Sequence, residues 1–409
     1  MSAMKNFVGW IDDRFPLTKV WNEHLAEYYA PKNFNFWYFM GSLAMLVLVN
    51  QILTGVWLAM SYKPDADLAF GSVEYIMRDV DWGWLIRYLH STGASAFLIV
   101  IYLHMFRGLM YGSYRKPREL LWIIGVVIYL AMMATAFFGY LLPWGQMSFW
   151  GAQVIVNLFS AIPVIGPDLG VWIRGDYVIS DATLNRFFAL HFLLPFLLAA
   201  LVFVHIVALH KVGSNNPDGI EIKKNKDENG IPKDGIPFHP YYSVKDIAGV
   251  AGFLFLFAAV VFFAPEMGGF FIEHPNFEPA NPLKTPEHIA PVWYFTPFYA
   301  ILRAVPSIAG SAFPGVAAML LSIVVMFFLP WLDRSPVKSI RYKGVIFKAS
   351  LAIFVVAFIM LGYLGTQPTT EGKTLLAQIG TVLYFAFFLL MPIYSKMDKT
   401  KPVPERVTK

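Results

Sequence analysis

The chain has 409 residues, of which 57% are hydrophobic and 14% are charged, and its net charge is +5. Soluble domains contain about 45–50% apolar and about 25% charged residues, so this composition excludes an ordinary soluble globule and a disordered chain. The lack of cysteine excludes disulfides, thiolate-held iron–sulfur clusters and covalently attached c-type haem. We therefore expect most of the chain to lie in lipid, with any redox metal bound by histidine or methionine. Nothing in the composition indicates a nucleic acid partner.

The first 32 residues are charged and lack the apolar core of a signal peptide. We expect them to lie on the membrane surface, with Phe7, Trp10, Ile11 and Phe15 along one side.

Eight apolar segments follow, each of a length near the roughly 20 residues that suffice to cross the hydrocarbon core. They are residues 36–60, 84–109, 120–142, 183–209, 247–264, 313–332, 345–364 and 375–393. Backbone groups in lipid must be paired within a segment. The sequence therefore predicts an all-α polytopic membrane protein with eight transmembrane helices.

The distribution of basic residues predicts the orientation of these helices. Eight spans place both termini on one side of the membrane. The loops and termini on that side carry 22 Lys and Arg residues, against 6 in the loops of the opposite side. Basic loops are retained in the cytoplasm, so we expect both termini to be cytoplasmic.

A polar stretch divides the eight spans into two groups. Residues 213–245 are rich in lysine, aspartate, asparagine and proline. We expect them to form a linker on the inner side, between an N-terminal four-helix domain (residues 1–212) and a C-terminal four-helix domain (residues 246–409).

Two loops on the outer side, residues 143–182 and 265–312, are too long to be simple connectors. Long ordered loops usually carry function. Their apolar stretches, residues 149–165 and 293–304, predict helices that lie on the outer surface.

Four histidines lie within the predicted spans, and they have a shared spacing. His90 and His104 on the second span, like His191 and His205 on the fourth, are 14 residues apart. That separation is roughly 21 Å along a helix and returns the side chain to nearly the same face. Both helices run from outside to inside, so His90 should lie level with His191, and His104 level with His205.

Two pairs of facing imidazoles, one pair at each level, predict metal ligation, which a single buried histidine would not predict. A lone buried histidine is usually a satisfied structural group, but polar groups at membrane depth are costly and usually functional. Two imidazoles from facing helices are what axial ligation of haem iron requires. Zinc is less favoured because no third or fourth ligand accompanies either pair. The sequence thus predicts an outer and an inner haem, which together would carry electrons across the membrane.

Glycines on the other two helices repeat the same spacing. Gly41 and Gly55 on the first span, and Gly125 and Gly139 on the third, are again 14 residues apart. Glycine lets a bulky group approach the helix backbone. Ordinary helix packing explains scattered glycines, but it does not explain why their period matches that of the histidines. We expect Gly41 and Gly125 beside the inner haem, and Gly55 and Gly139 beside the outer one.

Three arginines near these histidines are candidate partners for the anionic haem propionates. Arg87 and Arg186 precede the outer histidines, and Arg107 follows His104. Arginine near a helix end can pair with a carboxylate at the membrane surface. Anchoring at the interface would explain any one of them equally well.

Two other functions remain open at this point. One is a transporter whose intramembrane histidines relay protons. The other is a di-haem anchor of a quinone-linked dehydrogenase. The matched glycines argue against the transporter, and the long outer loops argue against the simple anchor.

The sequence resembles the cytochrome b family, the central subunit of ubiquinol–cytochrome c reductase (the cytochrome bc1 complex). The resemblance runs from about residue 33 to residue 391. Besides the histidines and glycines above, it rests on residues 139–145 (GYLLPWG), 160–163 (SAIP), 213–217 (GSNNP), 238–246 (FHPYYSVKD) and 300–306 (AILRAVP).

The resemblance implies two non-covalent b-type haems, a low-potential outer one and a high-potential inner one. It also implies oxidation of ubiquinol outside and reduction of ubiquinone inside, coupled to proton translocation by a Q cycle. The chain would be a catalytic subunit that is active only in its complex. The implied partners are a Rieske-type iron–sulfur protein, a membrane-anchored c-type cytochrome and a second copy of the complex. The implied location is a bacterial inner membrane.

The resemblance also implies residues for both quinone sites. At the inner site His210, Ser214, Lys245 and Asp246 would contact quinone, although Lys245 and Asp246 could equally form an interfacial anchor and cap. The outer site would be built from Phe137, Tyr140, Met147, Gly151, Pro291, Tyr294 and Tyr299.

The outer loop departs from the family at one position. Relatives usually have Pro-Glu-Trp-Tyr where this chain has Val292 between Pro291 and Trp293. Oxidising a quinol releases protons, which valine cannot accept. Of the other carboxylates in this loop, Glu266, Glu278 and Glu287 read as surface charges. Glu273 follows an apolar run, which would raise its pKa. We expect Glu273 to replace the missing acceptor; the alternative is a solvent-facing loop charge.

Overall fold

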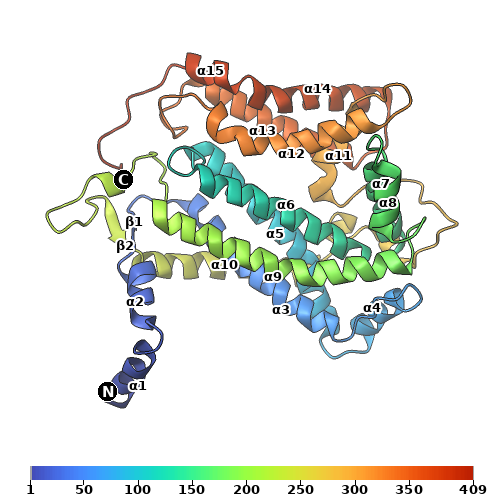
Figure 1. Cartoon of the computed structure of the whole chain (residues 1–409), viewed down its shortest axis with the longest axis horizontal. Helices are drawn as coiled ribbons and strands as arrows, with labels where there is room; N and C mark the ends of the chain where they lie inside the picture. Colours follow the sequence, from blue (N-terminus) through green and yellow to red (C-terminus); the bar gives the residue numbers. More distant parts are fainter. Residues whose placement is uncertain (1, 409) are drawn as a thin grey trace.

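The structure, a computed structural model, describes residues 2–408 as long helices that lie side by side (Figure 1). Eight of the described helices are long and apolar enough to cross a membrane, which confirms the predicted all-α fold. They are α3 (Phe39–Ala59), α5 (Gly83–Tyr111), α6 (Glu119–Leu141), α9 (Asp181–Val212), α10 (Tyr241–Phe263), α12 (Phe313–Leu332), α13 (Val345–Gly365) and α14 (Glu371–Leu389).

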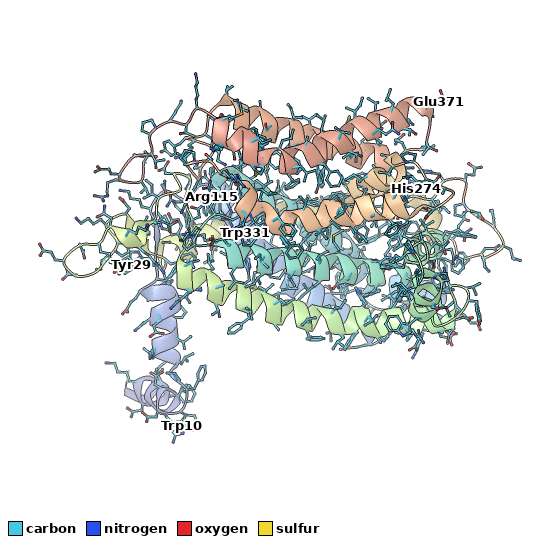
Figure 2. All side chains as sticks on the ribbon, turned by 45° about the horizontal axis from the view of Figure 1, so that its top comes forward. Trp10, Tyr29, Arg115, His274, Trp331 and Glu371 are labelled. Atoms are coloured by element: carbon cyan, nitrogen blue, oxygen red, sulfur yellow. The ribbon has the colours of Figure 1, made fainter. Side chains whose placement is uncertain are left out.

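Shorter elements gather at the two ends of the bundle. The end that holds α4 (Ala69–Arg78), α7 (Gln146–Ser160), α8 (Gly166–Arg174) and α11 (Thr296–Ala304) is called the outer end, after the predicted topology. It also holds the short turns η4 (Met267–Gly269), η5 (His274–Phe277) and η6 (Trp293–Phe295). Figure 2 shows His274 and Glu371 there, with Tyr29 and Arg115 at the opposite, inner end.

The inner end holds both ends of the described chain (Figure 1). The elements there are α1 (Ser2–Asp12), α2 (Leu17–Trp21), η1 (Asn22–Ala26), β1 (Tyr29–Pro31), η2 (Phe36–Tyr38), η3 (Ile222–Lys224), β2 (Gly235–Pro237) and α15 (Met391–Met397). Helices α1 and α2 extend away from the bundle as an arm, with Trp10 at its far end (Figure 2). Phe7, Trp10 and Phe15 are exposed on this arm.

Some predicted boundaries are wrong. Helix α10 begins at Tyr241, six residues before the predicted start, so Asp246 lies in its second turn. Hydropathy locates the apolar part of a helix, but the helix itself continues into polar residues at the interface. Helix α14 ends at Leu389 instead of continuing to residue 393. The helix predicted for residues 149–165 ends at Ser160; the chain then turns around Pro163 and Val164, where Val164 has a φ of +71°, and α8 begins at Gly166.

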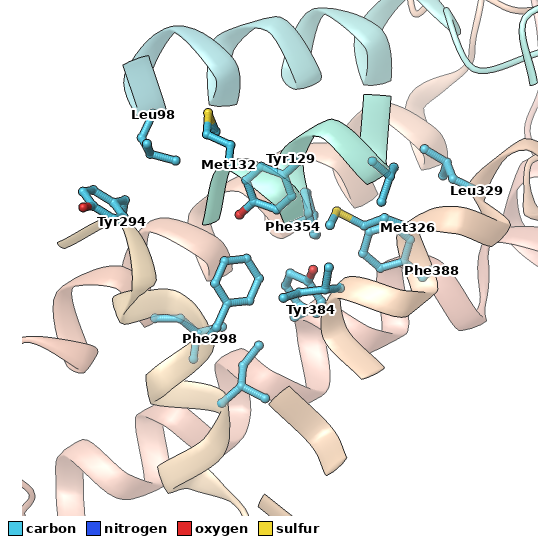
Figure 3. Close-up of a cluster of buried hydrophobic side chains, with 14 of the residues drawn as sticks. Leu98, Tyr129, Met132, Tyr294, Phe298, Met326, Leu329, Phe354, Tyr384 and Phe388 are labelled. Carbon is cyan, nitrogen blue, oxygen red and sulfur yellow. The ribbon is translucent and has the colours of Figure 1, made fainter. Parts of the chain in front are cut away.

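A large buried cluster joins the two halves of the chain (Figure 3). It packs Leu98, Tyr129 and Met132 of α5 and α6 against Met326, Phe354 and Tyr384 of α12, α13 and α14. The Trp122 indole N–H donates to the carbonyl of Met326 at 2.8 Å, which ties α6 to α12. The cluster extends to Val292 and Tyr294, so the second outer loop is anchored on the same core.

Ion pairs tie the chain ends to the inner loop. Strands β1 and β2 pair antiparallel, with Ala30 opposite Ile236. Beside them Asp234 lies 3.0 Å from the Lys32 ammonium and 2.7 Å from Nε of Arg406. The hydrogen bond from Arg406 lowers the pKa of Asp234 to about 2, so this carboxylate is ionised at neutral pH. The N-terminal strand, the inner loop and the C-terminal tail are thus held together at one point.

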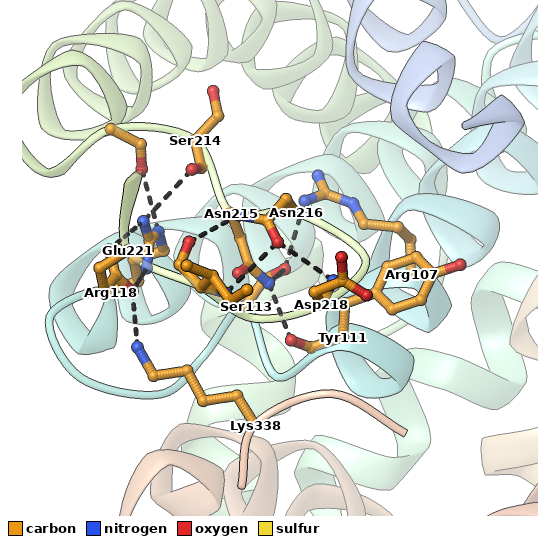
Figure 4. A network of polar contacts seen from close by, with 12 residues as sticks. Arg107, Tyr111, Ser113, Arg118, Ser214, Asn215, Asn216, Asp218, Glu221 and Lys338 are labelled. Atoms are coloured by element: carbon orange, nitrogen blue, oxygen red, sulfur yellow. Dashed lines mark hydrogen bonds and ion pairs between the residues drawn. The ribbon is translucent and has the colours of Figure 1, made fainter. Parts of the chain in front are cut away.

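Arg118 anchors the start of the inner loop (Figure 4). Its guanidinium donates to the carbonyls of Gly213 at 2.9 Å and Ser214 at 3.3 Å, and pairs with Glu221 at 2.6 Å. Lys338 approaches the same Glu221 carboxylate from the loop after α12. The backbone around Ser214 is therefore fixed against α6 and the C-terminal half.

Candidate functional site: two cavities at matched levels

The four predicted histidines lie on two helices of the N-terminal half, one pair on each. His90 and His104 are on α5, and His191 and His205 are on α9. The imidazole rings of His90 and His191 face each other with centroids 6.1 Å apart and planes nearly perpendicular. These two histidines line an outer cavity of about 220 Å³. His104 and His205 line an inner cavity of about 890 Å³. The structure therefore has the predicted two levels.

Hydrogen bonds orient the outer imidazoles. Nδ1 of His191 lies 2.8 Å from the carbonyl oxygen of Thr135, which can only accept, so Nδ1 carries the proton. Nε2 of a neutral His191 then keeps its lone pair and is able to ligate a metal. Nδ1 of His90 lies 2.9 Å from the hydroxyl of Thr54, which supports the same arrangement on α5.

Each of the four glycines lies against the histidine of its own level. A Cβ atom added at Gly41 would lie 3.7 Å from Cε1 of His104, and one at Gly125 would lie 3.3 Å from Cε1 of His205. At the outer level, a Cβ at Gly55 would lie 3.1 Å from Cε1 of His90, and Gly139 has no room for a Cβ beside His191. The glycines thus keep the helix backbones open where the cavities need space, which fits a flat ligand between the helices.

Two of the three predicted arginines line the cavities. Arg87 lines the outer one and Arg107 the inner one. The Arg107 guanidinium lies over the Tyr38 ring at 5.0 Å, and its buried Nε has no hydrogen-bond partner among the described residues. An unpaired buried guanidinium nitrogen fits a site for an anionic group. Arg186 lies elsewhere: it is exposed and donates to the carbonyl of Trp172.

The inner cavity also brings together the four residues expected at an inner quinone site. His210, Ser214, Lys245 and Asp246 all line it. The hydroxyl of Ser42 donates to Asp246 at 2.9 Å, and the Lys245 ammonium donates to the Tyr241 hydroxyl at 2.8 Å.

Sequence reasoning missed several polar residues of this cavity, among them Ser42 and Tyr28. Ser42 lies next to Gly41, which the glycine spacing had already singled out, and this adjacency was a usable signal. Tyr28 had none, because it reaches the cavity only through the pairing of β1 with β2.

The outer cavity contains part of the expected outer quinone site. Tyr140 and Tyr294 line it together with Glu273 and Val292. Five other expected residues lie outside the lining. Gly151 packs on the ring of Tyr140, and Phe137 packs on Phe187. Tyr299 lies under the Arg303 guanidinium. Met147 is buried and Pro291 is half-buried.

Glu273 is the carboxylate of the outer loop that lines the cavity. The Tyr140 hydroxyl donates to its Oε2 at 3.0 Å. Burial raises the pKa of Glu273 to about 7, although the Tyr140 hydrogen bond acts in the opposite direction. The other three carboxylates differ: Glu266 accepts a hydrogen bond from Tyr88 at 3.0 Å, and Glu278 and Glu287 are exposed.

Asn276 fixes the backbone that carries Glu273. Its side-chain oxygen accepts from the backbone N–H of Ser148 at 2.8 Å and from the Ser148 hydroxyl at 2.9 Å. Gly145 bridges to Pro279 beside it, and a Cβ at Gly145 would clash with Asn276. The second outer loop is thus joined to the start of α7. Asn276 was missed because nothing in the sequence pairs these two loops.

Comparison with known proteins gives the family. The family model "Cytochrome b/b6/petB" matches residues 25–213, and "Cytochrome b(C-terminal)/b6/petD" matches residues 279–385. The chain belongs to the cytochrome b family. It is 74% identical to cytochrome b of Allochromatium vinosum over the full length of both chains. It is 52% identical to cytochrome b of Rickettsia bellii, with 98% of this chain and 96% of that protein covered.

A solved structure supports the same assignment. The chain matches one from a hyperthermophilic respiratory complex III with a TM-score of 0.88 and 40% identity, covering 95% of this chain and 99% of that one. The resemblance inferred from the histidines, glycines and motifs is therefore confirmed. This cytochrome b is a multi-pass membrane protein, and its family binds haem.

The glycine beside His191 provides a test of the outer cavity. In Gly139→Leu the new side chain would fill the space against His191, so we expect the haem content of the purified protein to fall. Gly252→Leu is the matched control, because a Cβ at Gly252 on α10 meets no atom within 4 Å. Haem per chain is measured by the pyridine haemochrome spectrum. Normal haem content in Gly139→Leu would contradict a ligand in this cavity.

Proposed function

We propose that this cytochrome b carries electrons across the membrane between quinone sites at its outer and inner ends, as a subunit of a bc1-type complex III. One observation carries the proposal: two cavities at different levels of one four-helix bundle are each lined by one of the predicted histidine pairs and one of the predicted glycine pairs. The 14-residue spacing separates the levels by roughly 21 Å along the helices. A di-haem electron path across a membrane needs both levels.

The histidines would hold two b-type haems through their Nε2 atoms. His90 and His191 would bind the outer, low-potential haem, and His104 and His205 the inner, high-potential one. Each haem, when bound, would accept and release one electron. Arg87 and Arg107 would pair with propionates. The Thr135 carbonyl keeps His191 in the tautomer that ligation requires.

The inner cavity would bind ubiquinone for reduction, which consumes two protons. Asp246 and His210 are two of the titratable groups that line it, and each could pass a proton to a quinone oxygen. The hydroxyl of Ser42 holds the Asp246 carboxyl toward the cavity. Ser214 and Lys245 would supply hydrogen-bond donors to the head group.

The outer cavity would bind ubiquinol for oxidation, with Glu273 as a proton acceptor. Val292, which cannot accept a proton, lines the cavity, and Glu273 lines the same space. A carboxyl with a pKa of about 7 is matched to taking a proton from quinol and releasing it to water at neutral pH. The Tyr140 hydroxyl orients that carboxyl, and the Tyr294 ring would pack against the head group.

The proposed function also implies an assembly and a location for the chain. The chain would be a catalytic subunit that works only with a Rieske-type iron–sulfur protein and a membrane-anchored c-type cytochrome, in a homodimeric complex. The match to a respiratory complex III chain supports these partners. The basic inner loops support a location in the bacterial inner membrane with both termini in the cytoplasm.

Removing one inner ligand tests the two-haem path. In His205→Leu we expect one of two b-type spectral components to be lost or strongly shifted, while quinol still reduces the outer component. The control His239→Gln changes an exposed histidine at the same end and should leave both components intact. Reduced-minus-oxidised spectra measure the outcome. Two normal components in His205→Leu would contradict the assignment.

Replacing Glu273 tests the outer proton acceptor. In Glu273→Gln we expect the rate of steady-state quinol oxidation by the whole complex to fall by about a hundredfold. This is at the lower end of the rate effects that general acid–base groups typically contribute. The wild-type rate should rise with pH through about 7 as the Glu273 carboxyl becomes ionised, and this rise should be absent in the variant.

Two further variants separate proton transfer from loop structure. Adding Val292→Glu to Glu273→Gln should restore much of the rate, because both positions line the same cavity. Glu278→Gln changes an exposed carboxylate of the same loop and should have little effect. Unchanged activity in Glu273→Gln across the working pH range would rule out its role.

A further inference from the structure

Tyr28 lies at the inner cavity without belonging to the helical bundle. It stands immediately before β1, and its carbonyl accepts from the backbone N–H of Phe238 at 2.8 Å. Further along the same segment, β1 pairs with β2, and Lys32 forms an ion pair with Asp234. The N-terminal segment is thereby held across the cavity, with Tyr28 in its lining.

The Tyr28 hydroxyl makes two contacts with Ser214. The backbone N–H of Ser214 donates to the Tyr28 oxygen at 3.1 Å, and the two hydroxyl oxygens lie 2.8 Å apart. Arg118 holds the carbonyl of the same residue from the opposite side. Because backbone and side chain are both held, the Ser214 hydroxyl has one preferred direction.

The Tyr28 ring also packs on His210. The two rings meet edge to face, with centroids 4.7 Å apart. Nδ1 of His210 lies 3.0 Å from the carbonyl of Ile206 within α9, so the ring is restrained from both sides. Burial raises the pKa of the Tyr28 phenol, which therefore stays protonated at neutral pH.

We propose that Tyr28 is a positioning residue of the inner site: its hydroxyl fixes Ser214 and its ring fixes His210 on one side of the bound quinone. Asp246, held by Ser42, lies on the lining of the same cavity. Tyr28 acts through these residues, and its effect is on how well the quinone head group is bound. This inference rests on the proposed inner quinone site.

The test uses Tyr28→Phe in the complete complex, because this change keeps the ring and removes only the hydroxyl. The measured quantity is the rate at which added quinone reoxidises the inner haem, as a function of quinone concentration. We expect the KM for quinone to rise about fivefold, the effect of one hydrogen bond, with little change in the maximal rate. Tyr29→Phe, a neighbour outside the cavity lining, is the matched control and should leave KM unchanged.

A second variant shows whether Tyr28 acts through Ser214. Ser214→Ala should raise KM by itself, and adding Tyr28→Phe to it should have little further effect, since the shared hydrogen bond is already lost. Additive effects would overturn the proposed route. A loss of haem content or of maximal rate in Tyr28→Phe would mark a structural role and overturn the inference.

The failure of this inference is distinguishable from the failure of the inner site. If Ser214→Ala raises KM and Tyr28→Phe does not, the Tyr28 hydroxyl does not position Ser214, the inference as stated is overturned, and the quinone site stands. If wild-type protein shows no quinone-dependent reoxidation while quinol still reduces its haem, the inner site and the inference fall together.

Discussion

Imidazoles at membrane depth need one nitrogen paired and the other directed at a ligand. At the outer level the protein pairs Nδ1 of His191 with the Thr135 carbonyl and places Nδ1 of His90 beside the Thr54 hydroxyl. Both partners are on α3 and α6, the helices that also carry the glycines. Helices α3 and α6 therefore orient the histidines and leave space beside them. An apolar bundle offers few other hydrogen-bond partners, so at the outer level the packing of α3 on α5 and of α6 on α9 depends on these two contacts.

The two ends of the bundle differ in the polar groups that line their cavities. At the inner end, polar groups are abundant: Asp246, His210, Ser214 and Tyr28 share one large cavity. At the outer end the cavity is smaller, and Glu273 is the carboxylate on its lining. The Tyr140 hydrogen bond and the Asn276 contacts with α7 fix where that carboxyl lies. Under the proposed function, this arrangement would let a chain with valine at position 292 offer Glu273 as a proton acceptor to quinol.

The sequence predicts well the features that follow from lipid and from helix geometry. The eight spans and the level of each histidine were predictable, because backbone pairing in lipid leaves helices, and a helix fixes where residues 14 apart must lie. Features that depend on loop folding were not predictable. Arg186 lies against Trp172 instead of the cavity, and Tyr28 and Asn276 reach the sites only because separate loops pair. The burial of Glu273 was predictable because an apolar run precedes it.

The central claim is that one chain holds two haems at two levels with different potentials. A redox titration of the purified complex, followed by its b-type absorption and combined with haem counted per cytochrome b chain, tests this claim most directly. The account predicts two haems per chain and two components of equal amplitude, the higher-potential one being lost in His205→Leu. One haem per chain, or a single component in the titration, would contradict it.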